Sequence, residues 1–126
     1  MPALSSYDYA IIRVVPYVER GEFVNAGVIL FCRTQRYLAA RIDLDTKRLL
    51  ALAPHLDIEL IQANLATIPK ICEGQGEIGR LDLPERFHWL VAPRSTIIQV
   101  SPVHTGICAD PEESLEHLMD TMVRVG

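Results

Sequence analysis

YDYAIIRVVPYVERGEFVNAGVILFCR, residues 7–33, is the stretch that decides the fold. Two runs rich in β-branched and aromatic residues, 7–18 and 23–33, flank four residues of turn material. This pattern predicts a β-hairpin. A third such run at 37–44 follows after a short break, so we expect a three-stranded antiparallel meander. Gly27 inside the second run indicates a bulge or a close backbone approach.

The remaining segments carry helix signals and one more strand candidate. Aspartates or prolines that suit helix starts precede each apolar helical stripe. Helices are expected after Asp45, after Asp57, around Pro84 and after Asp110, and residues 95–101 form the fourth strand candidate. The sequence therefore predicts an α+β fold, with an antiparallel sheet of about four strands packed by amphipathic helices.

Size and composition limit the class of protein. The chain has 126 residues, of which 49% are hydrophobic and 22% charged, as expected for a single globular domain spanning residues 1–126. No apolar run approaches the roughly 20 residues of a membrane-spanning helix. The N-terminus lacks a secretory signal pattern, and three scattered cysteines do not suggest disulfides. We expect a cytoplasmic protein with no membrane association.

Charge and motifs argue against several functions. The net charge of −4 disfavours non-specific nucleic-acid binding. No phosphate-binding or dinucleotide-binding glycine pattern occurs, so no cofactor is predicted. His104 and Cys108 lie four apart, but no other histidine completes a zinc site and no CxxC is present. We therefore predict no metal site.

The two faces of the predicted hairpin differ in composition. Strict alternation places Ala10, Ile12 and Val14 on one face. The second strand then adds Val24, Ala26, Val28, Leu30 and Cys32 to this aliphatic face. The opposite face mixes arginine and asparagine with aromatic residues, including Tyr9, Tyr17, Phe23 and Tyr37. We expect helices on the aliphatic face, while the mixed face is either covered by another segment or offered to a partner or small ligand.

Arg13 is the least expected residue of this mixed face. An unpaired buried guanidinium is destabilising by roughly several kcal/mol, so Arg13 needs a partner. Glu22 is the expected one, with a ligand carboxylate as the alternative. Arg13, Glu22 and Asn25 would form a pocket with Arg94 and His104 if the fourth strand pairs nearby.

Two loop segments supply the other candidate residues. His104 and Thr105 lie in a predicted loop, where the imidazole could act as a general acid or base, or else bond the loop backbone. His104 is the sole catalytic candidate. Arg94 and Ser95, with Thr96, could clamp a phosphate, or could form a plain connection in which Arg94 pairs with an acidic neighbour.

Several longer motifs carry a family resemblance. They are YDYAIIR at 7–13, GEFVNAGVIL at 21–30, RFHWL at 86–90, APRS at 92–95 and SPVHTG at 101–106. The chain resembles, over nearly its whole length, the bacterial domain-of-unknown-function family numbered 3037. The resemblance implies no established activity. It does imply a context, because such proteins are often encoded beside HipA-like serine/threonine kinases, which makes such a kinase an expected partner.

Three functional hypotheses follow. The first is an interaction or regulatory module that docks a partner, such as a HipA-like kinase, with self-association left open. The second is a small enzyme or phosphate-ligand-binding domain built on the arginine, glutamate, asparagine and histidine pocket. The third is a single-stranded nucleic-acid binder that stacks bases on the aromatic residues of the mixed face.

Overall fold

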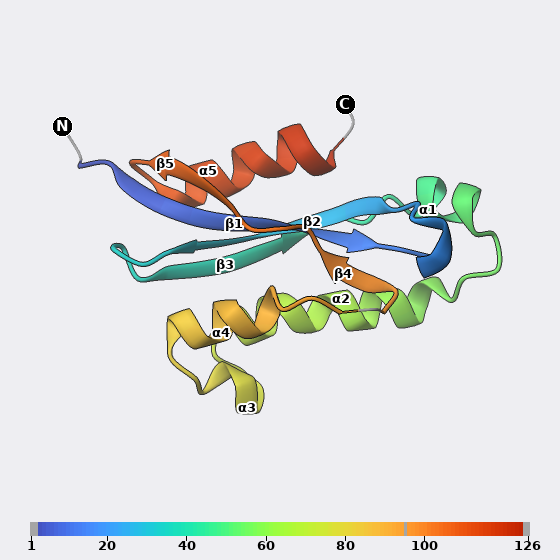
Figure 1. Ribbon diagram of the computed structural model, residues 1–126, viewed down its shortest axis with the longest axis horizontal. Helices are drawn as coiled ribbons and strands as arrows, with labels where there is room; N and C mark the ends of the chain where they lie inside the picture. The colour runs from blue at the N-terminus through green and yellow to red at the C-terminus, as the bar shows by residue number, and fades with distance from the viewer. Residues whose placement is uncertain (1–2, 95, 125–126) are drawn as a thin grey trace.

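A computed structural model describes residues 3–94 and 96–124 and shows an open antiparallel sheet with helices on both faces (Figure 1). The strand order is β3-β2-β1-β4, and β5 also pairs with β1. The strands are β1 (Ser5–Val14), β2 (Val24–Cys32), β3 (Tyr37–Ile42), β4 (Ile98–Val100) and β5 (His104–Cys108). The α+β class and the N-terminal meander are confirmed, with five strands in place of about four.

Four of the five helices in the described part of the chain begin where their N-terminal signals predict, and the exception is the short helix Gly76–Gly79, which no signal predicts. The helices are α1 (Thr46–Leu52), α2 (Ile58–Cys72), α3 (Gly76–Gly79), α4 (Leu83–Leu90) and α5 (Pro111–Leu118), with short turns η1 (Val18–Arg20) and η2 (Met119–Val123). The side chains of Asp45, Asp57, Asp82 and Asp110 each accept a hydrogen bond from a first-turn N–H, as N-caps do. No helix of the described residues is long and apolar enough to cross a membrane.

A bulge in β2 changes which residues share a face. Ile12 pairs with Gly27 but Arg13 pairs with Asn25, so Ala26 is an extra residue in β2. An extra residue reverses the alternation beyond it. The expected bulge near Gly27 is confirmed. The face assignment made by strict alternation is right for Val24 and Ala26, which share the cluster of Ile12 and Val14. It is wrong for Val28, Leu30 and Cys32, which point to the other face of the sheet.

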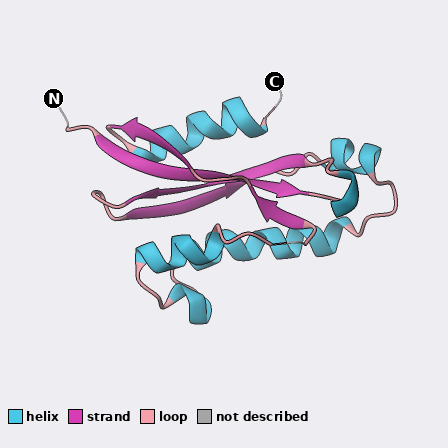
Figure 2. Cartoon of the chain, in the orientation of Figure 1, coloured by secondary structure: helices cyan, strands magenta, loops and turns pink. Residues whose placement is uncertain are grey.

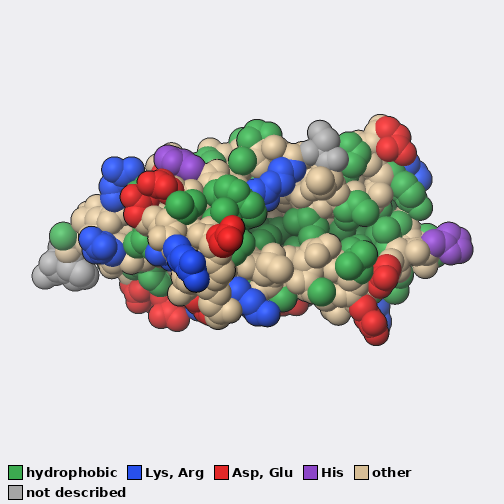
Figure 3. Space-filling model, turned by 90° about the horizontal axis from the view of Figure 1, so that it is seen from below, with side chains coloured by type: hydrophobic (Ala, Val, Ile, Leu, Met, Phe, Trp, Pro, Cys, Tyr) green, Lys and Arg blue, Asp and Glu red, His purple; other side chains and the backbone are tan. Residues whose placement is uncertain are grey.

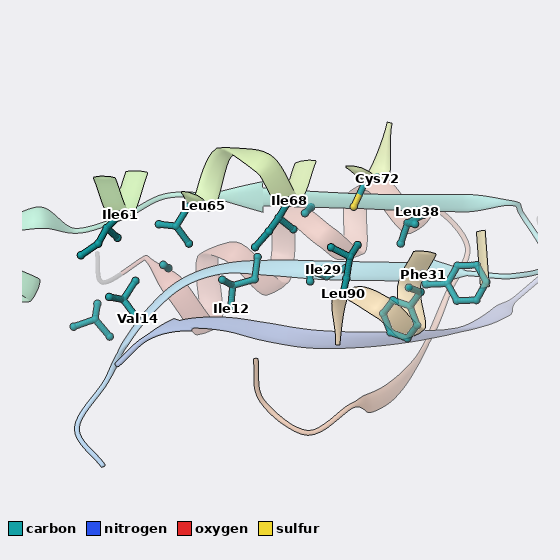
Figure 4. Packing of buried hydrophobic residues seen from close by; sticks show 14 of the residues in the cluster. Ile12, Val14, Ile29, Phe31, Leu38, Ile61, Leu65, Ile68, Cys72 and Leu90 are labelled. Atoms are coloured by element: carbon teal, nitrogen blue, oxygen red, sulfur yellow. The ribbon is translucent and has the colours of Figure 1, made fainter. Parts of the chain in front are cut away.

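The face with Ile12 and Val14 packs against α2 and α4, and we call it the α2 face. Ile61, Leu65, Ile68 and Cys72 point from α2 toward the sheet (Figure 4). Their spacing of 4, 3 and 4 residues is that of one helical face. Pro69 does not end this helix, which continues to Cys72.

The opposite face, here the α5 face, is covered by the C-terminal helix (Figure 2). Ile11, Val28 and Leu30 pack with Leu115 and Met119, and all five are buried. Tyr7, Tyr9 and Tyr37 are partly buried against the same cluster. Of the two outcomes considered for the mixed face, coverage by another segment is therefore the one observed over much of its area.

Strands β4 and β5 form one interrupted strand along β1. The register pairs Ile12 with Val100 and Tyr9 with His104. In the gap, the Ser101 N–H donates to the Ile11 carbonyl oxygen, and the Ile11 N–H donates to Ser101 Oγ, both at 2.8 Å. The serine hydroxyl thus replaces a main-chain acceptor where the strand is broken.

Candidate functional site

Arg13 and Asn25 are the predicted site residues that the fold brings together. They are register partners on β1 and β2. Arg13 lies between Ile12 and Val14, so its side chain is on the α5 face. Its guanidinium carbon lies 4.2 Å from the centroid of the Phe23 ring, a cation–π contact. Asn25 Nδ2 donates to the Met122 carbonyl oxygen at 2.9 Å, which ties η2 to the sheet.

Glu22 does not pair with Arg13, so this expected ion pair is wrong. The Glu22 carboxylate instead forms an ion pair with Arg20, whose Nε lies 2.8 Å from Glu22 Oε1, and both side chains are exposed. The Phe23 ring occupies the place by Arg13 that a carboxylate was expected to fill. Arg13 Nε and Asn25 Oδ1 are buried, and neither has a hydrogen-bond partner among the described residues.

His104 and Thr105 lie in β5, which corrects the prediction of a loop. His104 pairs with Tyr9, and the two ring centroids are 5.5 Å apart. The imidazole is exposed. Tyr9 and Arg13 are four residues apart on β1, so His104 lies about 13 Å along the strand from Arg13. The backbone register therefore separates the catalytic candidate from Arg13.

Arg94 lies on the α2 side of the sheet, away from Arg13. Its Nη2 donates to the Trp89 carbonyl oxygen at 2.8 Å, and its guanidinium carbon is 4.4 Å from the Trp89 ring centroid. The expected acidic neighbour is thus replaced by an aromatic ring. Ser95 lies outside the described residues. Arg94 lines a groove beside α2, whereas Arg13 is on the α5 face, so the predicted pocket does not assemble.

The groove beside Arg94 is the candidate site that the structure shows. It has a volume of about 560 Å³ and runs between α2, the end of α4 and the segment leading into β4. Figure 3 shows hydrophobic side chains gathered along a hollow in the middle of this face. The lining residues are Leu60, Ile61, Asn64, Thr67, Ile68, Ile71, Trp89, Leu90, Arg94, Thr96, Ile97 and Ile98. We call it the α2 groove.

Large apolar side chains are exposed at this groove. Leu60 is 58% exposed, Trp89 41% and Ile97 39%. Phe87, two residues before Trp89 on α4, is by contrast buried, at 2%. Three exposed apolar side chains at one concave site form a patch of the kind that binding surfaces present.

The charge of the α2 groove is simple. Arg94 is its only charged lining residue among those described, and no carboxylate lines it. Arg94 makes no ion pair among the described residues. The Trp89 contacts hold the guanidinium in place while leaving further N–H donors for another acceptor. The site therefore combines apolar walls with one positioned cation.

Sequence reasoning missed this groove, although one signal was present. Leu60, Asn64, Thr67 and Ile71 are spaced 4, 3 and 4 residues, which is a second stripe on α2 beside its core stripe. The second stripe begins and ends with an apolar residue, Leu60 and Ile71. The apolar surface of α2 is therefore wider than the stripe that packs on the sheet.

A larger hollow of about 790 Å³ lies between β3 and α2. Its charged lining residues are Arg41, Asp43, Lys70 and Glu73. Arg41 is already paired with Glu112 and Glu116 of α5, and Asp43 with Arg124. This mixture of signs, partly neutralised within the chain, favours no class of ligand.

The cysteines have no features of a nucleophile. Cys32, Cys72 and Cys108 are free and buried. Burial raises the pKa of Cys72 to about 12 and also raises that of Cys108, which disfavours the reactive thiolate. No group of three or more metal-ligating side chains occurs among the described residues.

Comparison with known proteins places the chain by family alone. No curated protein and no solved structure matches it. The model of a family described as "Protein of unknown function (DUF3037)" matches residues 9–123. Because this match spans most of the chain, the protein belongs to the DUF3037 family.

Proposed function

We propose that this domain is a protein-interaction module whose α2 groove binds an amphipathic helix of a partner protein. The observation that carries the proposal is the concave patch formed by Leu60, Trp89 and Ile97, each more than a third exposed. An amphipathic helix in an apolar groove is a common recognition mode, in which side chains at i, i+3 or i+4 serve as anchors.

Charge complementarity defines the partner further. The lone Arg94 beside apolar walls fits a helix that carries a carboxylate next to its apolar stripe. A fatty acid has the same two features, but the groove is an open furrow on the surface in Figure 3. A furrow of this kind leaves one side of its occupant in water, which suits the polar face of an amphipathic helix.

A displayed library of tryptophan-free amphipathic helical peptides tests the proposal. The chain contains one tryptophan, so the fluorescence of Trp89 reports binding at the groove. Selected peptides should carry apolar residues three or four apart and an acidic residue. Binding in the micromolar range should be lost in Ile97→Asp and weakened about tenfold in Arg94→Gln, as expected for a charge-assisted hydrogen bond.

The controls separate the groove from the rest of the surface. Val103→Asp changes an exposed apolar residue outside the α2 groove and should leave peptide binding unchanged. Selected peptides that bind Ile97→Asp as tightly as the native protein would overturn the proposal. Palmitate that quenches Trp89 fluorescence where no peptide binds would assign the groove to a fatty acid instead.

The partner suggested by the family resemblance is a HipA-like kinase, and we propose it as the first protein to test. Purified kinase and domain should form a complex on size-exclusion chromatography, and Ile97→Asp should abolish that complex. A complex that survives Ile97→Asp would place the interface outside the α2 groove.

A further inference from the structure

A smaller hollow lies on the α2 face, away from the α2 groove. It has a volume of about 190 Å³ and lies between the first half of β1, the end of β2 and α4. Its lining residues are Ser6, Tyr7, Asp8, Phe31, Arg33, Thr34, Phe87 and His88. No residue lines both hollows. We call it the Asp8 hollow.

The sheet register fixes the position of Asp8. It pairs with Phe31 on β2 and with Thr105 on β5, so it lies on the middle strand of three. Phe31 packs against Phe87 of α4, with ring centroids 5.3 Å apart. Direct register partners project to the same face, so the Asp8 carboxylate also points toward α4.

Arg33 lines the hollow together with Asp8. It follows Phe31, the register partner of Asp8, by two residues and begins the turn after β2. Neither Asp8 nor Arg33 takes part in an ion pair among the described residues. The hollow thus presents one negative and one positive group that do not neutralise each other.

The other lining groups add donors and an apolar floor. The hydroxyls of Ser6 and Thr34 and the imidazole of His88 line the hollow and are contributed by exposed residues. Phe31 and Phe87 are buried and form apolar lining below them. A simple anion would meet the Asp8 carboxylate, and a simple cation would meet the Arg33 guanidinium. Each would therefore be opposed by one of the two charges.

We infer that the Asp8 hollow binds a free α-amino acid. The ammonium group bonds the Asp8 carboxylate, and the carboxylate bonds the Arg33 guanidinium, since each is a charge-assisted hydrogen bond. The side chain of the ligand faces Phe31 and Phe87. A volume of about 190 Å³ accommodates a molecule of this size and excludes a nucleotide.

The test is titration of the ¹⁵N-labelled protein with each proteinogenic L-amino acid singly, up to about 10 mM, a range that detects millimolar affinities. At least one amino acid should shift the amide signals of Asp8, Thr34 and His88. Asp8→Asn and Arg33→Gln should each weaken binding about tenfold or more, as expected for loss of one charged hydrogen bond. Glu22→Gln and Arg36→Gln change charges outside the hollow and should leave binding unchanged.

Ligand derivatives identify which group meets which residue. The N-acetyl derivative lacks the ammonium, so it should bind native protein and Asp8→Asn equally weakly. The amide derivative lacks the carboxylate and should likewise not distinguish native protein from Arg33→Gln. Such non-additivity is the signature of a direct contact. Absence of binding by every amino acid, or equal binding of the N-acetyl derivative and its parent, overturns the inference.

The outcome is independent of the proposed interaction function. Ile97→Asp, which should abolish peptide binding at the α2 groove, should leave amino-acid binding unchanged. If Ile97→Asp lost both peptide binding and amino-acid binding, the α2 groove and the Asp8 hollow would be coupled, which would contradict a separate site at Asp8.

Discussion

Gly27 of β2 packs directly against the main-chain carbonyl oxygen of Arg41 on β3, leaving no room for a side-chain carbon between them. This contact lies beside the bulge at Ala26. The bulge determines which residues of β2 face α2 and which face α5. The close approach at Gly27 is therefore next to the residue that distributes the side chains of β2 between the two hydrophobic cores.

Gly27→Ala should lower the free energy of unfolding by about 3 kcal/mol, at the upper end of the range for overpacking. The added methyl group would meet the Arg41 carbonyl oxygen and also the Ile42 side chain. Urea denaturation followed by circular dichroism measures the change. Gly21→Ala is the control, because its added methyl meets nothing within 4 Å and carries only the strain of a φ of +71°, about 1–2 kcal/mol. Equal effects at both positions would contradict the close approach.

The local features of this fold could be predicted from sequence because they depend on neighbours along the chain. The meander follows from composition and short turns, and each aspartate cap bonds an N–H only two or three residues away. The bulge near Gly27 was also expected from the glycine itself. Its consequence for the faces was not, because strict alternation was continued past the extra residue.

The missed features depend on contacts between distant segments. β5 has a histidine, a threonine and a glycine that resemble a loop, and it becomes a strand by pairing with β1 about one hundred residues earlier. The α2 groove requires residues 60–71 to lie beside residues 89–94 and 96–98. The predicted pocket failed for a related reason, since Arg13 and Arg94 occur on opposite faces of a sheet whose topology the sequence does not reveal.

Ser101→Ala should lower the free energy of unfolding by about 1–3 kcal/mol, because the buried Ile11 N–H would lose its acceptor. The effect should be accompanied by faster hydrogen exchange at the Ile11 amide. Thr67→Ala is the control, since it removes an exposed hydroxyl that donates to the Asn64 carbonyl oxygen, and it should change stability by less than about 0.5 kcal/mol. Unchanged exchange at Ile11 in Ser101→Ala would refute the bridging role of the hydroxyl.

Phe87→Ala and Trp89→Ala should differ strongly in stability although the two residues are neighbours on α4. Phe87 is 2% exposed and packs on Phe31, so its truncation should be destabilising by about 3–5 kcal/mol. Trp89 is 41% exposed at the rim of the α2 groove, so its truncation should be destabilising by about 1 kcal/mol or less. Thermal unfolding followed by circular dichroism distinguishes them. A comparable loss of stability in both variants would indicate that Trp89 is buried in the core as Phe87 is.

Alkaline pH should destabilise the fold through Cys72. Burial is the main cause that raises the pKa of this thiol from 9.0 to about 12, and the nearby Arg86 partly opposes it. Below pH 9 both the folded and the unfolded chain hold the proton, so Cys72 adds no pH dependence. Between pH 9.0 and about 12 the unfolded chain loses the proton while the folded chain keeps it. The free energy of unfolding should therefore fall by about 1.4 kcal/mol per pH unit from this group.

Comparison with Cys72→Ala isolates this contribution, because Tyr7, Tyr37 and Cys108, whose pKa values are also raised, remain in both proteins. The variant starts from a lower stability because it leaves a cavity, but its stability should fall less steeply above pH 9. The two urea-denaturation curves of stability against pH should therefore converge as the pH rises. Parallel curves from pH 8 to 11 would show that the folded protein loses the Cys72 proton as readily as the unfolded chain, and that the thiol is not desolvated beneath α2.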